Sequence, residues 1–129
     1  MNPSHRYEGL VEYISGNYRN AVEIGIGHFP DVAYALLEKG IKVFATDVKA
    51  YRYRGFKVIV DDVTMPDISL YTAIDLLYAL RPPPELVPYM ERLSKMFSSD
   101  LIVKPLSSEY LNGQLHCYGD TTFFLWSSS

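Results

Sequence analysis

Cysteine is almost absent from this sequence. Cys117 is its only cysteine, which excludes an internal disulfide bond and any zinc site built from several cysteines. We expect Cys117 to pack as a small apolar residue in a strand. Histidine is also scarce, and His5 and His116 have no partner at metal-ligand spacing. No metal site is therefore predicted.

An excess of basic charge is lacking as well. Twelve Lys and Arg against 15 Asp and Glu give a net charge of −3, so nothing attracts the whole chain to nucleic acid or to an anionic membrane. No apolar run approaches the roughly 20 residues of a membrane-spanning helix, and no secretory signal is recognised. We therefore expect a cytoplasmic protein that does not bind membranes.

The rest of the composition is typical of one globular domain. The chain has 129 residues, of which 48% are hydrophobic and 21% charged, and this length is common for a single domain. We predict one domain over 1–129, with a short N-terminal helix over 6–15 and a frayed tail over 127–129. No internal repeat is visible.

Apolar strands alternate with helical patterns along most of the chain. Beyond the first helix, helices are predicted over 31–39 and 84–97, and strands over 21–26, 42–46, 56–60, 72–79, 100–104, 114–118 and 121–126. The last two strands flank Gly119-Asp120 and form a hairpin. This order predicts an α/β fold: a three-layer sandwich whose doubly wound, mostly parallel sheet ends in an antiparallel hairpin.

The most informative segment is the turn after the first predicted strand, at 21–26. Gly25 and Gly27 stand where the chain leaves the sheet, and glycine allows a ligand to approach the main chain closely. Pro30 suits the first position of the helix that follows. Asp47 ends the second strand about 20 residues later, where an acid can accept hydrogen bonds from ribose hydroxyls. The segment predicts a pocket for an adenosine-type cofactor. The alternative is a turn kept for packing alone.

Two residues argue against a dinucleotide such as NAD or FAD. The dinucleotide fingerprint needs a third small residue at the position of Pro30. It also places a pyrophosphate at the helix N-terminus, where the negative charge of Asp31 would repel it. An NAD-type binder is therefore the less favoured alternative.

The segment resembles motif I of the class I S-adenosylmethionine-dependent methyltransferases, an acid-x-Gly-x-Gly pattern. The resemblance implies S-adenosylmethionine as the cofactor, with the acid of motif I near its methionine end, the acid after the second strand on its ribose and an acid of the next loop near its adenine. The matching residues are Glu23, Gly25, Gly27, Asp47 and one of Asp61 and Asp62. Phe29 departs from the pattern because it replaces a third glycine. Asp61 and Asp62 have a second interpretation, as caps of the following turn.

Catalytic residues are sought in the loops after the strands, because ligands of such sheets lie at the carboxyl ends of the strands. Arg81, before three prolines, suits a fixed contact with an anion, or else it pairs with Glu85 or caps backbone carbonyls. Tyr78 is a polar candidate near the cofactor, or a packed core residue. His28 is a candidate base or a loop hydrogen-bonding residue. Lys104 and Glu109 stand in or near the loop after the fifth strand.

The loop after the second strand combines cations and aromatic rings. The residues are Lys49, Tyr51, Arg52, Tyr53 and Arg54. Phosphate contacts and base stacking by such residues suit RNA or a nucleotide. The alternative is a solvated loop whose tyrosines cover the edge of the sheet.

Several segments resemble a small archaeal family of uncharacterised proteins with a methyltransferase-like Rossmann core. They are Val-Glu-Ile-Gly-Ile-Gly, Ala-Thr-Asp-Val, Ile-Asp-Leu-Leu-Tyr-Ala-Leu-Arg-Pro-Pro and Leu-Ile-Val-Lys-Pro-Leu. The chain leaves no room for a substrate-binding insert, so we expect a second subunit, a partner or the substrate to complete the pocket, as in a homodimer. Two functions follow: methyl transfer to an acceptor near Arg81, or a non-catalytic scaffold with a degenerate cofactor pocket.

Overall fold

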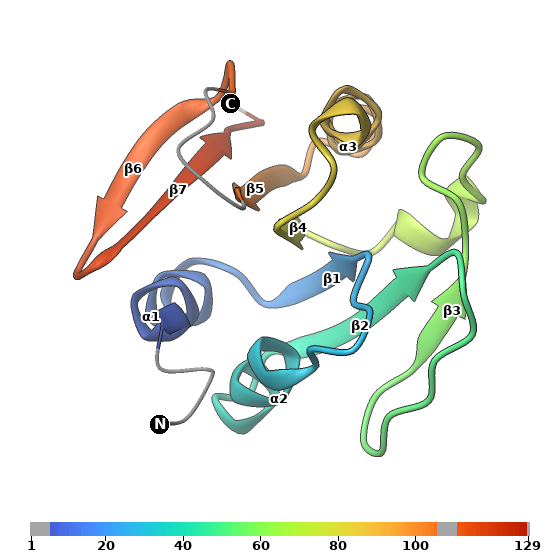
Figure 1. Cartoon of the computed structure of the whole chain (residues 1–129), viewed down its shortest axis with the longest axis horizontal. Helices are drawn as coiled ribbons and strands as arrows, with labels where there is room; N and C mark the ends of the chain where they lie inside the picture. The colour runs from blue at the N-terminus through green and yellow to red at the C-terminus, as the bar shows by residue number, and fades with distance from the viewer. Residues whose placement is uncertain (1–5, 106–110, 129) are drawn as a thin grey trace.

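A central sheet with helices on both faces forms the protein, as Figure 1 shows for the computed structural model, which describes residues 6–105 and 111–128. The sheet has seven strands in the order β3-β2-β1-β4-β5-β7-β6. In chain order they are β1 (Asn20–Ile24), β2 (Lys42–Asp47), β3 (Val58–Val60), β4 (Leu76–Leu80), β5 (Asp100–Lys104), β6 (Gln114–Tyr118) and β7 (Thr121–Trp126). β1 to β5 are parallel, and β7 runs antiparallel to β5 and β6. The predicted parallel sheet with a C-terminal antiparallel hairpin is confirmed.

The helices form the outer layers of the sandwich. α1 (Glu8–Asn17) and α2 (Asp31–Glu38) cover one face, and α3 (Val87–Met96) covers the other, together with the short 3-10 helices η2 (Ile68–Tyr71) and η3 (Pro84–Leu86). Alternate residues of each strand enter opposite cores. Along β4, Tyr78 packs with α1 and α2, whereas Leu77 and Ala79 pack with α3.

The connection between α2 and β2 follows from one glycine. Gly40 has φ of +86°, a left-handed conformation that a side chain would strain. Its N–H donates to the Leu37 carbonyl at 3.0 Å, and the Ile41 N–H donates to the Leu36 carbonyl at 3.1 Å. These two bonds form a Schellman motif that closes the helix.

Several element boundaries differ from the predicted ones. The first helix spans 8–17 rather than 6–15, and Pro30 is the N-cap of α2 rather than its first residue. The strand predicted from residue 72 begins at 76, because the Asp75 carboxylate accepts the N–H groups of Arg19 and Asn20 at 2.9 Å and ends the preceding turn. The third strand begins at 58 rather than 56, since Phe56 stacks on Tyr53 in a turn.

Two further expectations concern exposure. Cys117 lies in a strand as predicted, but it is exposed on β6 rather than packed, because β6 is one of the two edge strands of the sheet. In the predicted tail, Ser127 and Ser128 follow β7 without regular structure, and Ser129, like His5 and Glu109, lies outside the described residues. Among the described helices, none combines the length and apolar character needed to cross a bilayer.

The order of the strands determines where a ligand can enter. From β1 the chain builds outward through β2 and β3 on one side, and then through β4 and β5 on the other. The loops that follow β1 and β4 therefore diverge to opposite faces and leave a crevice at the carboxyl ends of these two strands.

The close contact between α1 and the hairpin generates the first prediction. A Cβ added at Gly9 would lie 2.5 Å from the Tyr118 carbonyl oxygen and 2.7 Å from the Thr121 hydroxyl, whereas one at Gly16 on the same helix meets nothing within 4 Å. We expect Gly9→Ala to lower the free energy of unfolding by about 1–3 kcal/mol. Gly16→Ala should raise it by about 0.5–1 kcal/mol. Urea unfolding measures both, and changes of equal sign would contradict the close contact.

Candidate cofactor-binding site

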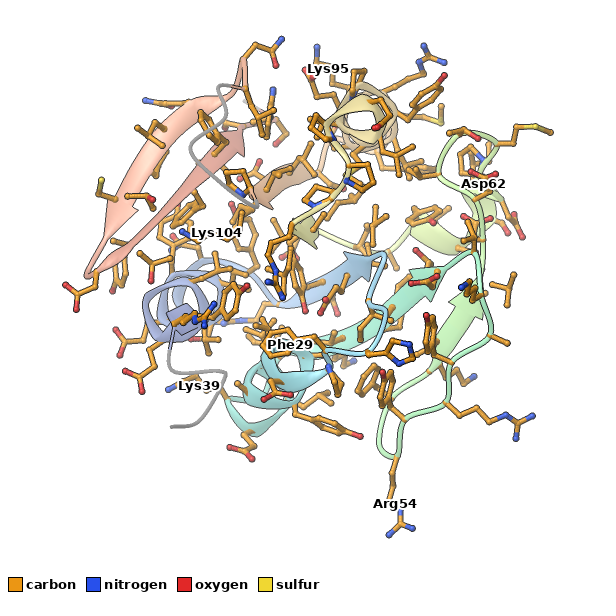
Figure 2. The ribbon with its side chains drawn as sticks, viewed as in Figure 1. Phe29, Lys39, Arg54, Asp62, Lys95 and Lys104 are labelled. Atoms are coloured by element: carbon orange, nitrogen blue, oxygen red, sulfur yellow. The ribbon has the colours of Figure 1, made fainter. Side chains whose placement is uncertain are left out.

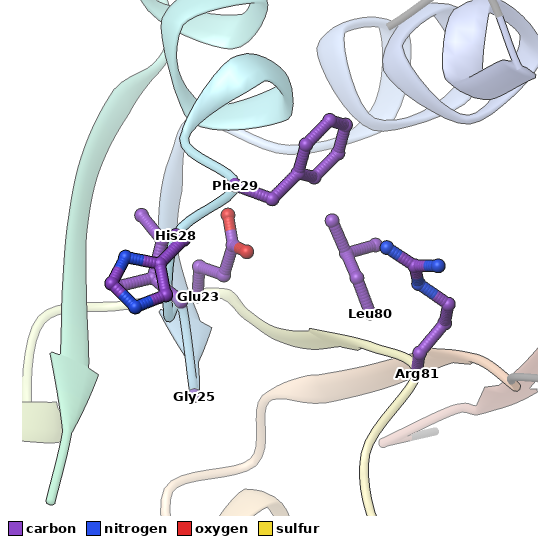
Figure 3. A pocket seen from close by; sticks show the side chains of 7 residues that line it. Glu23, Gly25, His28, Phe29, Leu80 and Arg81 are labelled. Atoms are coloured by element: carbon purple, nitrogen blue, oxygen red, sulfur yellow. The ribbon is translucent and has the colours of Figure 1, made fainter. Parts of the chain in front are cut away.

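A cavity of about 430 Å³ lies at the crevice between the carboxyl ends of β1 and β4 (Figure 3). This volume falls within the range of small-molecule sites. The lining residues are Glu23, Gly25, Ile26, His28, Phe29, Leu80 and Arg81. The structure thus brings together four of the predicted site residues, namely Glu23, Gly25, His28 and Arg81.

The glycine turn lies beside the cavity: Gly25 lines it, whereas Gly27 is not among the lining residues. Gly25 and Gly27 have φ of +75° and +55°, and the Gly25 N–H donates to the Thr46 carbonyl at 2.8 Å. A Cβ built on either glycine would meet nothing within 4 Å. Glycine is therefore required here by the backbone conformation and not by packing, and the space beside the turn is open to a ligand.

Glu23 is a buried acid in the wall of the cavity. It pairs with Tyr78 across β1 and β4, and the Tyr78 hydroxyl donates to Glu23 Oε1 at 2.8 Å. The residue is 1% exposed, and this burial raises the pKa of Glu23 to about 8, although the bond from Tyr78 acts in the opposite direction. Glu23 is therefore mostly protonated at neutral pH, and a cationic group entering the cavity would favour its ionised form.

Tyr78 does not reach the cavity. Its side chain is fully buried in the core between the sheet and the helices α1 and α2. Burial, and next the charge of Glu23, raise the pKa of Tyr78 well above its ordinary value. Of the three predicted catalytic candidates, His28 and Arg81 line the cavity, whereas Tyr78 occupies the packed position that was its alternative interpretation.

Asp47 supports the glycine turn from the end of β2. Its Oδ2 accepts the Gly27 N–H at 2.9 Å, and its Oδ1 accepts the Lys49 N–H at 3.0 Å. Asp47 is not among the residues that line the cavity, but Gly27 precedes His28, which does line it. Each carboxylate oxygen can accept a further hydrogen bond.

Asp61 and Asp62 organise the loop that follows β3. Asp61 accepts the Asp67 N–H at 2.9 Å and the hydroxyl of buried Tyr71 at 2.6 Å. Asp62 accepts the N–H and the hydroxyl of Thr64 at 2.9 and 2.7 Å, and these bonds, the N–H first, lower the pKa of Asp62. Both acids lie outside the cavity lining and have the turn-capping contacts of their second interpretation. An adenine contact by either stays a prediction.

The tyrosines of the loop after β2 face the glycine turn. The Tyr53 hydroxyl donates to the Gly27 carbonyl at 2.5 Å, and the Tyr51 ring meets His28 edge to face at 5.0 Å between centroids. Arg52 and Arg54 are exposed, and Figure 2 shows Arg54 pointing away from the fold. This geometry matches the alternative in which the tyrosines cover the sheet edge. Binding of nucleic acid by the loop stays a prediction.

Phe29 forms a side wall and does not fill the cavity. Its ring packs against the core of α1 and α2, and its centroid lies 5.4 Å from the centroid of the Tyr7 ring. Figure 3 shows the ring directed toward α1 and away from Gly25. The residue that departs from the methyltransferase pattern therefore leaves the space beside the glycine turn open.

Arg81 stands on the opposite wall, directly after β4. Its N–H donates to the Lys104 carbonyl at 2.6 Å, and its backbone has a φ of +53°. The nearby Lys104 ammonium donates to the Thr122 carbonyl at 2.6 Å, and burial lowers the pKa of Lys104. Glu85 makes no ion pair with Arg81 in the described part of the chain.

Sequence reasoning missed three residues of the site and gave a fourth, Tyr53, another role. Ile26 and Leu80 supply apolar wall, and Tyr71 anchors Asp61. Tyr53, which was predicted as part of a loop that binds RNA or a nucleotide, holds the glycine turn. The two apolar residues could have been found, because Ile26 ends a predicted strand and Leu80 directly follows one. Nothing distinguishes Tyr71 among the 11 tyrosines of the sequence. Within the described residues, no cluster of three or more His, Cys, Asp or Glu side chains is arranged to hold a metal ion.

The burial of Glu23 generates the second prediction. Because the Glu23 pKa rises from 4.5 to about 8 on folding, its contribution to stability is fully present below about pH 4.5 and is lost as the pH rises through about 8. Glutamine is neutral at every pH, so we expect Glu23→Gln to flatten this decline. Above pH 8 its free energy of unfolding should exceed that of the wild type by a few kcal/mol. Urea unfolding at several pH values measures the effect.

The control is Glu12→Gln, because Glu12 is an exposed glutamate of α1. The stability of the Glu12→Gln variant should decline with rising pH as that of the wild type does. Parallel curves for the wild type and Glu23→Gln would show that Glu23 is not the titrating group.

The fold is shared with solved methyltransferases. A SAM-dependent methyltransferase from Archaeoglobus fulgidus superimposes with a TM-score of 0.62 at 17% identity, over 84% of this chain and 53% of that one. A 1,6-didemethyltoxoflavin-N1-methyltransferase from Burkholderia thailandensis, solved with S-adenosylhomocysteine, gives a TM-score of 0.53 at 17% identity, over 92% and 58% of the two chains. The chain thus spans little more than half the length of these structures, and the likeness shows the Rossmann-like fold alone.

Sequence relatives agree with this fold and identify the family. A UPF0146 protein of Archaeoglobus fulgidus is 41% identical over 118 residues, which are 90% of this chain and 91% of the relative. Residues 8–128 match the family model described as "Uncharacterised protein family (UPF0146)". The predicted resemblance to a small archaeal family with a methyltransferase-like core is confirmed, and the chain belongs to the UPF0146 family.

Proposed function

We propose that the cavity at β1 and β4 binds S-adenosylmethionine and that the protein transfers its methyl group to an acceptor beside the cavity. One observation carries the proposal: an open glycine turn and a buried acid, Glu23, share one cavity at the point where the strand order reverses. The fold of the solved methyltransferases supports it.

The chemistry of the lining suits such a ligand. Glu23 offers a carboxylate to a cationic group at the methionine end, and Gly25 lets the ligand lie against the main chain. Ile26 and Leu80 supply apolar surface. Asp47 adjoins the glycine turn, where the resemblance assigns it to the ribose.

The reaction requires little of the protein beyond positioning. When bound, the cofactor supplies a sulfonium methyl group: the bond from the acceptor to the methyl carbon forms as the sulfur–methyl bond breaks, and the sulfur becomes a neutral thioether. The protein has to hold the acceptor in line, and such positioning is worth several kcal/mol of the barrier. His28 and Arg81 are the polar side chains of the wall that can contact the acceptor.

Calorimetric titration with S-adenosylmethionine, S-adenosylhomocysteine and NAD tests the proposal. We expect the first two to bind and NAD to fail. Gly25→Ala should weaken binding about tenfold or more, because its methyl group enters the ligand space. Gly40→Ala is a matched control: both glycines have positive φ and open surroundings, but Gly40 caps α2, away from the cavity.

Equal loss of binding in both variants would show that backbone strain alone is responsible. Asp47→Ala, in the same titration, tests the ribose assignment. Binding that survives in Asp47→Ala would remove Asp47 from the site and leave the cavity itself supported.

Proton release on binding supplies a further prediction. With a pKa of about 8, Glu23 carries its proton in about nine of ten molecules at pH 7. A cationic ligand group beside it should release up to about one proton, so affinity should rise from pH 6.5 to 8.5. Titrations in buffers of different ionisation enthalpy measure the release. Glu23→Gln should release none, and an unchanged release in that variant would contradict the assignment.

A non-catalytic scaffold is the second candidate, and the short chain favours it. The chain spans only 53% and 58% of the two solved methyltransferases. Failure of all three ligands to bind the wild type would support the scaffold. The function would then lie in a partner or a second subunit, and the homodimer stays a prediction that sedimentation can test.

A further inference from the structure

We infer that Arg81 binds a carboxylate or phosphate group of the ligand that enters the cavity. The inference rests on the proposed function and deepens it, because it assigns a chemical class to one end of the ligand. Three observations carry it: the backbone of Arg81, the lack of a partner for its guanidinium among the described residues, and the position of Glu23 across the same cavity.

The backbone of Arg81 is strained where no helix end explains the strain. Arg81 and Ser98 are the two described non-glycine residues with positive φ, both at 53°. Ser98 follows α3, where the Ser99 N–H donates to the Ser94 carbonyl at 2.9 Å, an ordinary helix end. Arg81 instead follows a strand. Strain of this kind persists where the surrounding structure fixes it, often at a ligand site.

The surroundings of Arg81 fix its position. Its N–H is held by the Lys104 carbonyl at 2.6 Å, and three prolines follow it, of which Pro82 is buried. Proline restricts φ, so this loop has few alternative conformations. The side chain therefore leaves a rigid support at the rim of the cavity, and Figure 3 shows it running back alongside Leu80.

The guanidinium has no partner in the described part of the chain, whereas the neighbouring Lys104 ammonium is held by the Thr122 carbonyl. Arg81 and Glu23 are the charged residues of the lining, one a cation and the other a buried acid. A planar guanidinium prefers carboxylate and phosphate oxygens, which it binds through two parallel hydrogen bonds. The pair suits a ligand, or two adjacent ligands, with a cationic and an anionic group.

The oxyanion has two sources, which an experiment can separate. One is the carboxylate at the amino-acid end of the cofactor. The other is a carboxylate or phosphate of the methyl acceptor. Three probes suffice: S-adenosylhomocysteine, 5′-methylthioadenosine, which lacks the amino-acid end, and inorganic phosphate.

The test compares Arg81→Gly with Ser98→Gly. Both variants relieve the same positive φ, so both should keep or raise the melting temperature. If the cofactor carboxylate contacts Arg81, the affinity for S-adenosylhomocysteine should fall about tenfold or more in Arg81→Gly alone. The affinity for 5′-methylthioadenosine should be unchanged. If the acceptor supplies the oxyanion, the affinity for S-adenosylhomocysteine should be unchanged in Arg81→Gly. Phosphate should then shift the NMR signals of the wild type with S-adenosylhomocysteine bound, but not those of Arg81→Gly.

The inference is overturned if neither S-adenosylhomocysteine nor phosphate distinguishes Arg81→Gly from the wild type. If S-adenosylhomocysteine does not bind the wild type, the proposed function fails, and phosphate alone decides the role of Arg81. Phosphate that shifts the Arg81 Nε–H signal of the wild type, with a response that persists in Ser98→Gly, supports the anion site. Absence of any phosphate response in the wild type overturns it.

Discussion

The position of β1 between β2 and β4 is the constraint on which the site depends. Parallel pairing on both sides of β1 fixes the register of Glu23 opposite Ala45 and Tyr78. Because the sheet grows in opposite directions from this strand, the following loops separate and a cavity remains between them. Helices on both faces then bury β1 and β4 from both sides, and the cavity lies at the carboxyl ends of these two strands.

The same pairing makes the electrostatics of the cavity unusual. Glu23 points toward the layer of α1 and α2, where its side chain is 1% exposed. A buried carboxyl group costs free energy unless it is protonated or paired, and here Tyr78 provides a hydrogen bond but no positive charge. The fold thus retains an acid that hydrophobic packing would not select. Retention of such a group in a cavity wall is typical of functional sites.

The segment between β2 and β3, which contains no helix, supports the glycine turn. The segment between β2 and β3 is too short for a crossover helix, and it packs its aromatic residues against the turn instead. Asp47 holds the Gly27 N–H and Tyr53 holds the Gly27 carbonyl, so side chains fix both polar groups of this residue. A turn held in this way needs little reordering when a ligand binds.

The elements with a regular pattern of apolar residues were the ones that the sequence predicted well. The strands at 100–104, 114–118 and 121–126 have the predicted bounds, because short apolar runs between turn residues leave little choice. The turn at Gly25 and Gly27 was equally predictable, since few other residues adopt its backbone angles. Residues that act through distant contacts were not. Asp61 pairs with Tyr71, and no local pattern reports that bond.

The exposure of Cys117 at the sheet edge and the backbone strain at Arg81 could not be predicted from the sequence. Cys117 was expected to be packed because apolar residues in a strand usually face a core, but strand order alone decides which strand lies at the edge. Likewise, the sequence suggests a stiff loop after Arg81, whereas the φ of +53° and the bond from its N–H to the Lys104 carbonyl on the neighbouring strand are features of the folded chain. Tertiary pairing therefore holds the backbone of Arg81 at the rim of the cavity, while its guanidinium has no partner in the described part of the chain.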